Sequence, residues 1–218
     1  MKDPIFIFAL PRSGSTLFMR LLAQSQDVDG KPVSSNGELD ILWQVVEIYR
    51  ALVVADQRNS TTGDLEKVFR PLQFQGDLES ALISLRKCFL SICTKDLNST
   101  CSIKTVNFGL TDRFSELLNG LKSVFPSSKF VFHTRDVNDV LKSMSKHPWW
   151  ETDEESRRNR INRQVANYIN ALDSNTDHVK SEYEDLLDYV KFSTVIGKLG
   201  LTITEERFTT VLGKILKR

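Results

Sequence analysis

The sequence predicts a single α/β domain, built on a central and mostly parallel sheet that is flanked by helices. Two largely apolar runs, at residues 5–10 and 129–134, are typical of strands that are buried on both faces of a sheet. A helical pattern follows each run, and strands that alternate with helices favour a parallel sheet. The chain has 218 residues, enough for one such domain and too few for two, so we expect the domain to span residues 1–218.

The composition argues against several classes of partner. Charged residues make up 26% of the chain and apolar residues 40%, which is the balance of a soluble globular protein. The net charge is +1, so no global field favours nucleic acid or an anionic membrane. No segment is long enough to span a bilayer, and the N-terminus lacks the pattern of a signal peptide. We therefore expect a cytoplasmic protein that binds anions only at a local site.

The three cysteines do not indicate a metal centre, because their spacing fits no common metal motif. Cys88 and Cys93 fall in an apolar helical pattern, and we expect both to be buried free thiols. A disulfide framework is not expected in a chain that can form so large a core.

Strands and helices follow one another along most of the chain. A helix from Thr16 to Leu22 follows the first strand, and a helix from Asp136 to Lys146 follows the strand at residues 129–134. Weaker strands are expected at residues 102–106 and 178–181. Further helices are predicted at residues 39–55, 78–94, 112–124, 154–172, 184–199 and 205–216. The polar stretch from Asp56 to Gly76 is interpreted as a surface connection rather than a loop over a site.

The first strand runs into the loop Pro11-Arg12-Ser13-Gly14-Ser15-Thr16, whose residue types suit an anion. A tight turn from a strand into a helix directs successive backbone N–H groups, and the positive end of the helix, at one point. Arg12 adds a planar fork of donors, the serine and threonine side chains add hydroxyls, and Gly14 allows a close approach of the backbone. The loop therefore predicts a site for phosphate or sulfate.

This loop is similar in frame to the P-loop of nucleotide-binding proteins, which has the pattern G-x-x-x-x-G-K-[ST]. Gly14 and Thr16 match the second glycine and the final hydroxyl, whereas Ala9 replaces the first glycine and Ser15 replaces the lysine. We thus expect a fold like that of the P-loop NTPases, with the positive charge moved to Arg12. The missing lysine weakens the hypothesis of an ATPase or GTPase.

The segment from Phe8 to Leu17 resembles the 5′-phosphosulfate loop of sulfotransferases that use 3′-phosphoadenosine 5′-phosphosulfate (PAPS), in the form found in Golgi-type and bacterial members. The resemblance covers most of the chain, from Pro4 to about Gly200. It implies that PAPS is bound by a set of loop residues, namely Arg12, Ser13, Gly14, Ser15, Thr16 and Leu17.

A second motif of this family is similar to the segment that follows the strand at residues 129–134. Arg135 and Asp136 come directly after this strand, and Ser143 lies eight residues beyond Arg135. In the family, the arginine and the serine of this motif hold the 3′-phosphate. An arginine at the carboxyl end of a parallel strand also faces the crevice in which such sheets bind ligands. An ion pair of Arg135 with a nearby acid, and an exposed helix position for Ser143, are the simpler alternatives.

Two weaker similarities concern the sheet. Tyr183-Glu184-Asp185-Leu186 resembles a family element that follows a late strand, and we interpret it as structural. Ile103-Lys104-Thr105 resembles the central strand whose lysine faces the sulfuryl group, although a solvated edge lysine explains Lys104 nearly as well. The basic, glycine-containing loop with which many members close over the 3′-phosphate has no convincing counterpart. The candidates for this role are a run of arginines on one predicted helix, namely Arg157, Arg158, Arg160 and Arg163.

The acceptor hydroxyl needs a general base, and Glu38 is our candidate. It lies in Asn36-Gly37-Glu38-Leu39, and the protein-tyrosine and bacterial glycolipid branches of the family place a glutamate base in a similar stretch. We expect Glu38 at the N-terminus of a helix, where a carboxylate is also a normal capping choice. None of the three histidines, His133, His147 and His178, occupies the position of the histidine base that other members use.

The resemblance implies transfer of a sulfuryl group from PAPS to an acceptor hydroxyl, with release of adenosine 3′,5′-bisphosphate (PAP) and without a metal. Arg12 would hold the 5′-phosphosulfate, Glu38 would accept the proton, and Lys104 would stabilise the bridging oxygen. A P-loop kinase or NTPase that needs Mg²⁺, and a non-catalytic nucleotide-binding relative, are the alternatives. The acceptor stays open between a small metabolite, a sugar, a lipid head group and a peptide tyrosine, and Trp149-Trp150 is a candidate part of its cleft.

Overall fold

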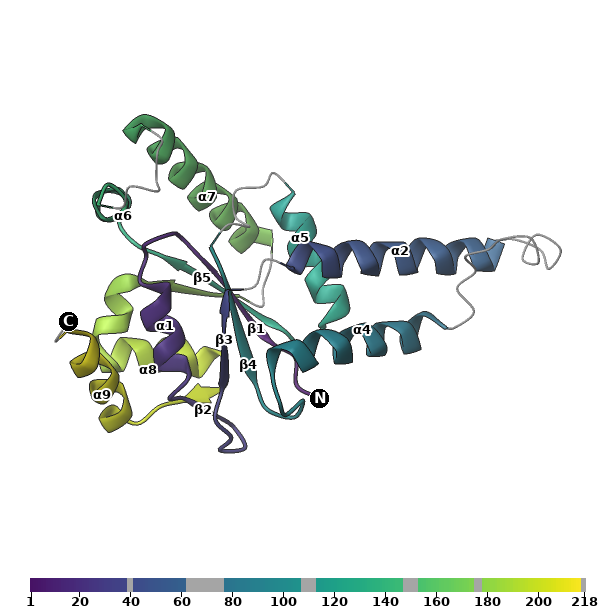
Figure 1. Ribbon diagram of the computed structural model, residues 1–218, viewed down its shortest axis with the longest axis horizontal. Coiled ribbons are helices and arrows are strands. Elements are labelled where there is room, and N and C mark those ends of the chain that lie inside the picture. The colour runs from purple at the N-terminus through teal and green to yellow at the C-terminus, as the bar shows by residue number, and fades with distance from the viewer. Residues whose placement is uncertain (39–40, 62–76, 107–112, 147–152, 175–177, 217–218) are drawn as a thin grey trace.

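The computed structural model describes residues 1–38, 41–61, 77–106, 113–146, 153–174 and 178–216 (Figure 1). The strands are β1 (Ile5–Ala9), β2 (Gln26–Asp27), β3 (Ser34–Glu38), β4 (Cys101–Thr105), β5 (Lys129–Thr134), β6 (His178–Glu182) and β7 (Leu201–Thr202). The helices are α1 (Ser15–Leu22), α2 (Leu42–Thr61), α4 (Leu78–Cys93), α5 (Phe114–Val124), α6 (Val137–Met144), α7 (Glu154–Ser174), the 3₁₀ helix η2 (Tyr183–Leu187), α8 (Tyr189–Lys198) and α9 (Glu205–Leu216).

Five strands form one parallel sheet in the order β3-β4-β1-β5-β6. The first strand of the chain, β1, lies in the middle, and its Ile7 is opposite Lys104 of β4 and Val131 of β5. The predicted α/β fold with a parallel sheet is therefore confirmed. This order places the carboxyl ends of β4, β1 and β5 side by side. Parallel sheets of this type bind ligands at the carboxyl ends of their strands. The short strands β2 and β7 form a separate antiparallel pair.

The alternation of side chains along β1 divides the core into two layers. Phe6 and Phe8 face a cluster that includes residues of α2, α4, α5, α6 and α7. Ile5, Ile7 and Ala9 face the opposite cluster, which includes residues of α1, α8 and α9. Both faces of the strand are thus buried, and this explains why its sequence is a continuous apolar run rather than an alternating one.

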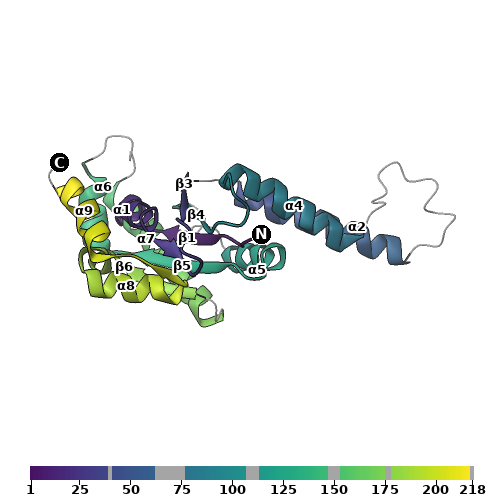
Figure 2. The same cartoon turned by 90° about the horizontal axis from the view of Figure 1, so that it is seen from below.

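Helices α2 and α4 run side by side and extend well beyond the sheet (Figures 1 and 2). Their buried residues are confined to the turns near the sheet, such as Val46 of α2 and Phe89 of α4. Farther out, Val54 and Ile83 are exposed. None of the helices in the described ranges is long and apolar enough to cross a membrane.

Several sequence predictions about these elements were wrong in detail. Ser34–Glu38 forms an edge strand that no apolar residue signals, so α2 begins at Leu42 instead of residue 39. The helix predicted at residues 184–199 is divided into η2 and α8. Asp188 separates them, because its side chain accepts hydrogen bonds from the N–H groups of Val190 and Lys191 and so caps the start of α8. α2 also continues to Thr61, six residues past its predicted end at residue 55, and the rest of the stretch up to residue 76 lies outside the described ranges.

The cysteine predictions are half correct. Cys93 is buried as expected, and burial raises the pKa of its thiol to about 11. Cys88 is exposed, because it lies on the side of α4 that faces away from Phe89 and Leu90.

Candidate active site

The loop between β1 and α1 is a tight turn with two residues in the left-handed backbone region. Gly14 has a φ of 85° and Arg12 a φ of 59°, which is uncommon for a residue other than glycine and occurs preferentially at functional sites. Ser13, between them, is fully buried, and both its hydroxyl and its N–H donate to the carbonyl oxygen of Leu10. The Ser13 hydroxyl is therefore used inside the turn, and the exposed Thr16 and the Ser15 next to it lie at the start of α1.

Unpaired backbone N–H groups gather where the loop becomes α1. Within the part of the chain that the structure describes, no hydrogen bond uses the N–H of Gly14, Ser15, Thr16 or Leu17, and no side chain caps the helix. The first turn of a helix leaves such groups free, and together with the helix dipole they attract an anion. The geometry is thus the one that the sequence of the loop predicts.

Tyr183 covers the loop from η2. A Cβ atom on Gly14 would lie 2.5 Å from Cδ2 of the tyrosine ring, so the glycine is needed for this close packing. The other partner of the ring is Arg135, whose guanidinium carbon lies 4.1 Å from the ring centroid. The sequence predicts a structural role for this segment, and in the structure Tyr183 contacts both Gly14 of the loop and Arg135 of the second motif. Only the packing of distant segments reveals this, so no sequence signal could have shown it.

Arg12 connects the loop to the second motif. Its Nε donates a hydrogen bond of 3.2 Å to the hydroxyl of Ser143 on α6. Arg135, at the end of β5, makes an exposed ion pair of 3.4 Å with Asp139, as the simpler sequence-based alternative expected. Exposed pairs of this kind contribute little to stability. The Nε atom of Arg135 is buried and has no hydrogen-bond partner among the described residues.

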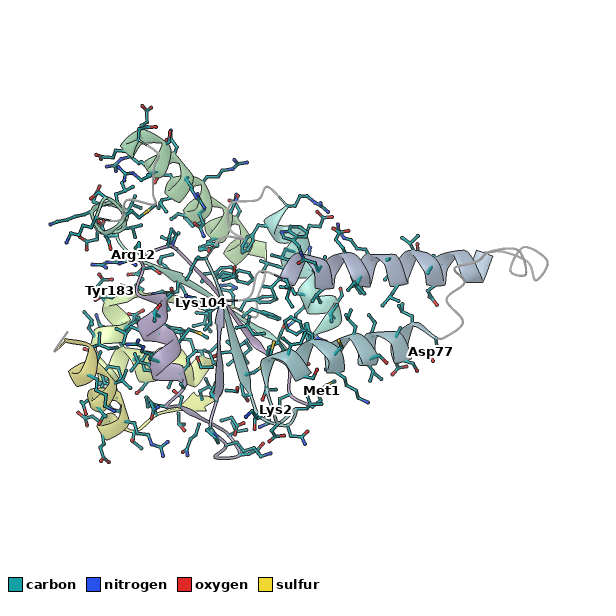
Figure 3. All side chains as sticks on the ribbon, viewed as in Figure 1. Met1, Lys2, Arg12, Asp77, Lys104 and Tyr183 are labelled. Carbon is teal, nitrogen blue, oxygen red and sulfur yellow. The ribbon has the colours of Figure 1, made fainter. Side chains whose placement is uncertain are left out.

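Lys104 and Glu38 lie opposite each other on neighbouring parallel strands. The pairing of β3 with β4 shifts register between Asn36 and Glu38, which places the backbone of Glu38 opposite Lys104. Irregularities of this type re-aim side chains and are common next to active sites. The predicted helix N-terminus is wrong, because Glu38 is the last residue of β3; its side chain lies outside the described part of the structure. In Figure 3, Arg12 and Tyr183 lie beside α1, and Lys104 lies nearer to the middle of the sheet.

Two of the four candidate arginines lie near the second motif. Arg157 and Arg158 line a cavity of about 260 Å³ between α6 and α7, together with Lys142, the neighbour of Ser143. Arg160 and Arg163 are exposed elsewhere on α7.

Three other parts of the sequence were considered for the site. His178 is the first residue of β6 and therefore lies at the amino ends of the parallel strands, away from the β1–α1 loop. His147 and Trp149-Trp150 lie outside the described residues. Among the residues that are described, no group of three or more His, Cys, Asp or Glu side chains is arranged to hold a metal ion.

His133 contacts the loop from the buried side, a role that the sequence analysis did not assign to it. It is completely buried, and its Nε2 lies 2.8 Å from the carbonyl oxygen of Ser13. Its Nδ1 lies 3.1 Å from the hydroxyl of Ser181 on β6, and the ring stacks on Phe18 of α1. The odd position of a polar residue within an apolar strand was the one signal that the sequence offered.

Gly14→Ala is expected to destabilise the protein more than Gly30→Ala. Both glycines have a positive φ, 85° and 73°, so alanine strains the backbone at both positions. Only at Gly14 does the new Cβ also meet the ring of Tyr183, and such overpacking costs about 1–3 kcal/mol. Thermal unfolding should therefore show a Tm for Gly14→Ala that lies several degrees below that of Gly30→Ala. Equal losses would contradict the packing of Tyr183 on Gly14.

Comparisons with known proteins bear on the family and the fold of the chain. The sequence model of the sulfotransferase family matches residues 4–199 of the chain. A solved structure titled as a sulfotransferase domain from the curacin biosynthetic pathway is similar with a TM-score of 0.61 and 17% identity, over 95% of this chain and 77% of that chain. A tunicamycin resistance protein from Deinococcus radiodurans is similar with a TM-score of 0.48 and 15% identity, over 94% of this chain and 98% of that chain. Among curated proteins, no sequence matches significantly.

The family match extends over nearly the whole chain. It includes the β1–α1 loop with its free N–H groups, Lys104, and the Arg135 and Ser143 positions that the fold brings close to this loop. The structural similarity shows the same fold independently of the sequence match. The chain therefore belongs to the sulfotransferase family.

Proposed function

We propose that the protein transfers a sulfuryl group from PAPS to an acceptor hydroxyl and releases PAP, without a metal. Membership of the sulfotransferase family supports sulfuryl transfer in general. The observation that carries the choice of donor is the meeting of two anion-binding motifs, which the hydrogen bond between Arg12 and Ser143 joins directly. A donor with phosphate groups at both the 5′ and 3′ positions fits two such motifs side by side.

The 5′-phosphosulfate is proposed to bind at the loop. Its oxygens would accept hydrogen bonds from the N–H groups of Gly14, Ser15 and Thr16 at the start of α1, which have no partner among the described residues. Arg12 would turn its guanidinium from Ser143 to the ligand, because a charge-assisted hydrogen bond to phosphate is stronger than one to a neutral hydroxyl.

The 3′-phosphate is proposed to bind between Arg135 and Ser143. The ring of Tyr183 holds the guanidinium of Arg135 in place, so little side-chain entropy is lost when the ligand binds. Ser143 becomes available when Arg12 moves to the 5′ group. Lys142, Arg157 and Arg158 line the neighbouring cavity together with Glu154, which pairs with Arg158. The lining keeps an excess of positive charge, so the three basic residues are the candidates for closing this side of the site.

The reaction breaks the bond between sulfur and the bridging oxygen of PAPS and forms a bond between sulfur and the acceptor oxygen. Glu38 would accept the proton of the acceptor hydroxyl, and Lys104 would stabilise the negative charge that develops on the bridging oxygen. The pairing of the two residues across β3 and β4, at the edge of the sheet next to the loop, supports these roles. A small hydroxylated molecule, a sugar or a peptide side chain are the acceptor classes to screen.

The competing hypothesis of a Mg²⁺-dependent kinase needs a carboxylate that is free to serve a metal. Asp136 lies just after β5, the strand of the second motif. Its carboxylate accepts hydrogen bonds from the N–H groups of Asn138 and Asp139 and so caps α6. Both hydrogen bonds go to Oδ1, so one carboxylate oxygen is used in the helix cap, and ligand binding is the measurement that separates the two hypotheses.

Ligand-induced stabilisation separates the two hypotheses. PAP should raise the Tm in the presence of EDTA, because a ligand that binds only the folded state stabilises it by mass action. ATP with Mg²⁺ should give a smaller shift at the same concentration. Stabilisation by ATP with Mg²⁺ and not by PAP would contradict the proposed donor, and PAP binding without turnover on a broad acceptor screen would indicate a non-catalytic relative.

Glu38→Gln should abolish most of the turnover and leave PAP affinity nearly unchanged. The amide cannot accept a proton, and loss of a general base lowers kcat by about 10²–10⁴. The matched control is Glu79→Gln, which makes the same chemical change at an exposed position in the first turn of α4. Steady-state kinetics with PAPS and titration calorimetry with PAP measure both quantities. Unchanged turnover in Glu38→Gln would remove Glu38 from the mechanism.

A further inference from the structure

We propose that His133 is a positioning residue, which orients the Ser13–Gly14 peptide so that the N–H of Gly14 faces the donor anion. The inference rests on the proposed function for the identity of that anion, the 5′-phosphosulfate of PAPS. The effect on the loop itself follows from the contacts of His133 alone. These contacts join three segments that are distant in sequence, namely the loop, β5 and β6.

The hydrogen bonds of His133 fix which ring nitrogen carries the proton. The carbonyl oxygen of Ser13 can only accept, so Nε2 of His133, 2.8 Å away, must be the N–H donor. In the neutral ring Nδ1 is then an acceptor, and the Ser181 hydroxyl donates a hydrogen bond of 3.1 Å to it. Both ring nitrogens are therefore satisfied, which compensates for the burial of a polar side chain.

The ring stays neutral at any pH at which the enzyme is expected to work. Burial lowers the pKa of His133 to about 4, against the opposing effects of its hydrogen bond to Ser13 and of the charge of Asp185 on η2. Phe18 on α1 and Ser181 on β6, which also contact the ring, do not titrate in this range. The tautomer that donates to Ser13 is thus present without competition from a charged form.

The direction of the Gly14 N–H follows from the geometry of the peptide bond. In a planar trans peptide the C=O of one residue and the N–H of the next point in opposite directions. Because His133 holds the carbonyl of Ser13 toward the buried side, the N–H of Gly14 points away from the core. Within the described residues this N–H has no hydrogen-bond partner, and it precedes the free N–H groups of α1.

A second set of contacts makes this orientation depend on His133. The N–H and the hydroxyl of Ser13 both donate to Leu10, which fixes the peptide before Ser13 but not the one after it. Glycine tolerates a wide range of backbone conformations, so the residue type at Gly14 does not by itself fix the orientation of the Ser13–Gly14 peptide. Among the described contacts, the hydrogen bond from His133 is the one that holds its carbonyl. A peptide fixed in advance binds an anion without the cost of ordering it.

Two substitutions and one control test this role. His133→Leu removes the donor at similar volume, and we expect it to weaken PAP binding about tenfold or more and to raise the KM for PAPS, since hydrogen bonds to charged groups are the strong ones. His133→Gln can place an amide N–H near the position of Nε2 and should recover much of this loss. Val131→Ala removes a buried side chain of the same strand, on the same face, without touching the loop, so it should lower the Tm and leave PAP affinity unchanged.

Nuclear magnetic resonance of the ¹⁵N-labelled free protein gives a readout that packing alone would not produce. The ring nitrogens of His133 should show the Nε2–H tautomer and no titration between about pH 5 and 8. Titration with inorganic sulfate should shift the Gly14 amide signal in the wild type and much less in His133→Leu. An Nδ1–H tautomer, or equal Gly14 responses in the two proteins, would overturn the proposal.

The two sets of results separate the inference from the proposed function. If wild-type protein does not bind PAP, the proposed donor is wrong, and the sulfate response of Gly14 still decides the role of His133. If PAP binds equally well to the wild type and His133→Leu, the donor stands and the positioning role is wrong.

Discussion

The parallel pairing of β1 with β4 on one side and β5 on the other is the constraint on which the site depends. The two buried faces of β1 carry different side chains, with Phe6 and Phe8 on one and Ile5, Ile7 and Ala9 on the other. A slip of the register by one residue would exchange large rings with smaller side chains in two packed layers. This parallel pairing places the carboxyl ends of β4, β1 and β5 next to one another. The loop that follows β1, Lys104 of β4 and Arg135 after β5 then lie within one region of a protein whose net charge is only +1.

The loop itself is held from two sides. Tyr183 packs on Gly14 from η2 and also holds the guanidinium of Arg135, so one aromatic ring positions parts of both motifs. His133 holds the carbonyl of Ser13 from the core. Between these two supports lie the N–H groups at the start of α1, which have no partner among the described residues. In the proposed function, groups that are fixed in this way stabilise the donor without being reordered when it binds.

The sequence predicts the part of this arrangement that local patterns carry. The apolar runs identify β1 and β5. The spacing of Arg135 and Ser143 marks the second motif, and in the structure Ser143 contacts Arg12 of the loop. Ser34–Glu38 contains no apolar residue that would mark it as a strand, and it becomes one only through its pairing with β4. For this reason the sequence led us to expect Glu38 at a helix N-terminus. The contacts of His133 join residues 120 positions apart, and no local pattern can predict them.

In the proposed function, one ligand with two anionic groups joins the loop to the Arg135 motif. The most direct measurement compares the affinities of PAP and adenosine 5′-monophosphate, which lacks the 3′-phosphate, in the wild type and in Arg135→Leu. We expect the wild type to prefer PAP by about tenfold or more, because the 3′-phosphate gains charge-assisted hydrogen bonds, and Arg135→Leu to lose most of this preference with little change for the monophosphate. Equal affinities of the wild type for the two nucleotides would contradict the account.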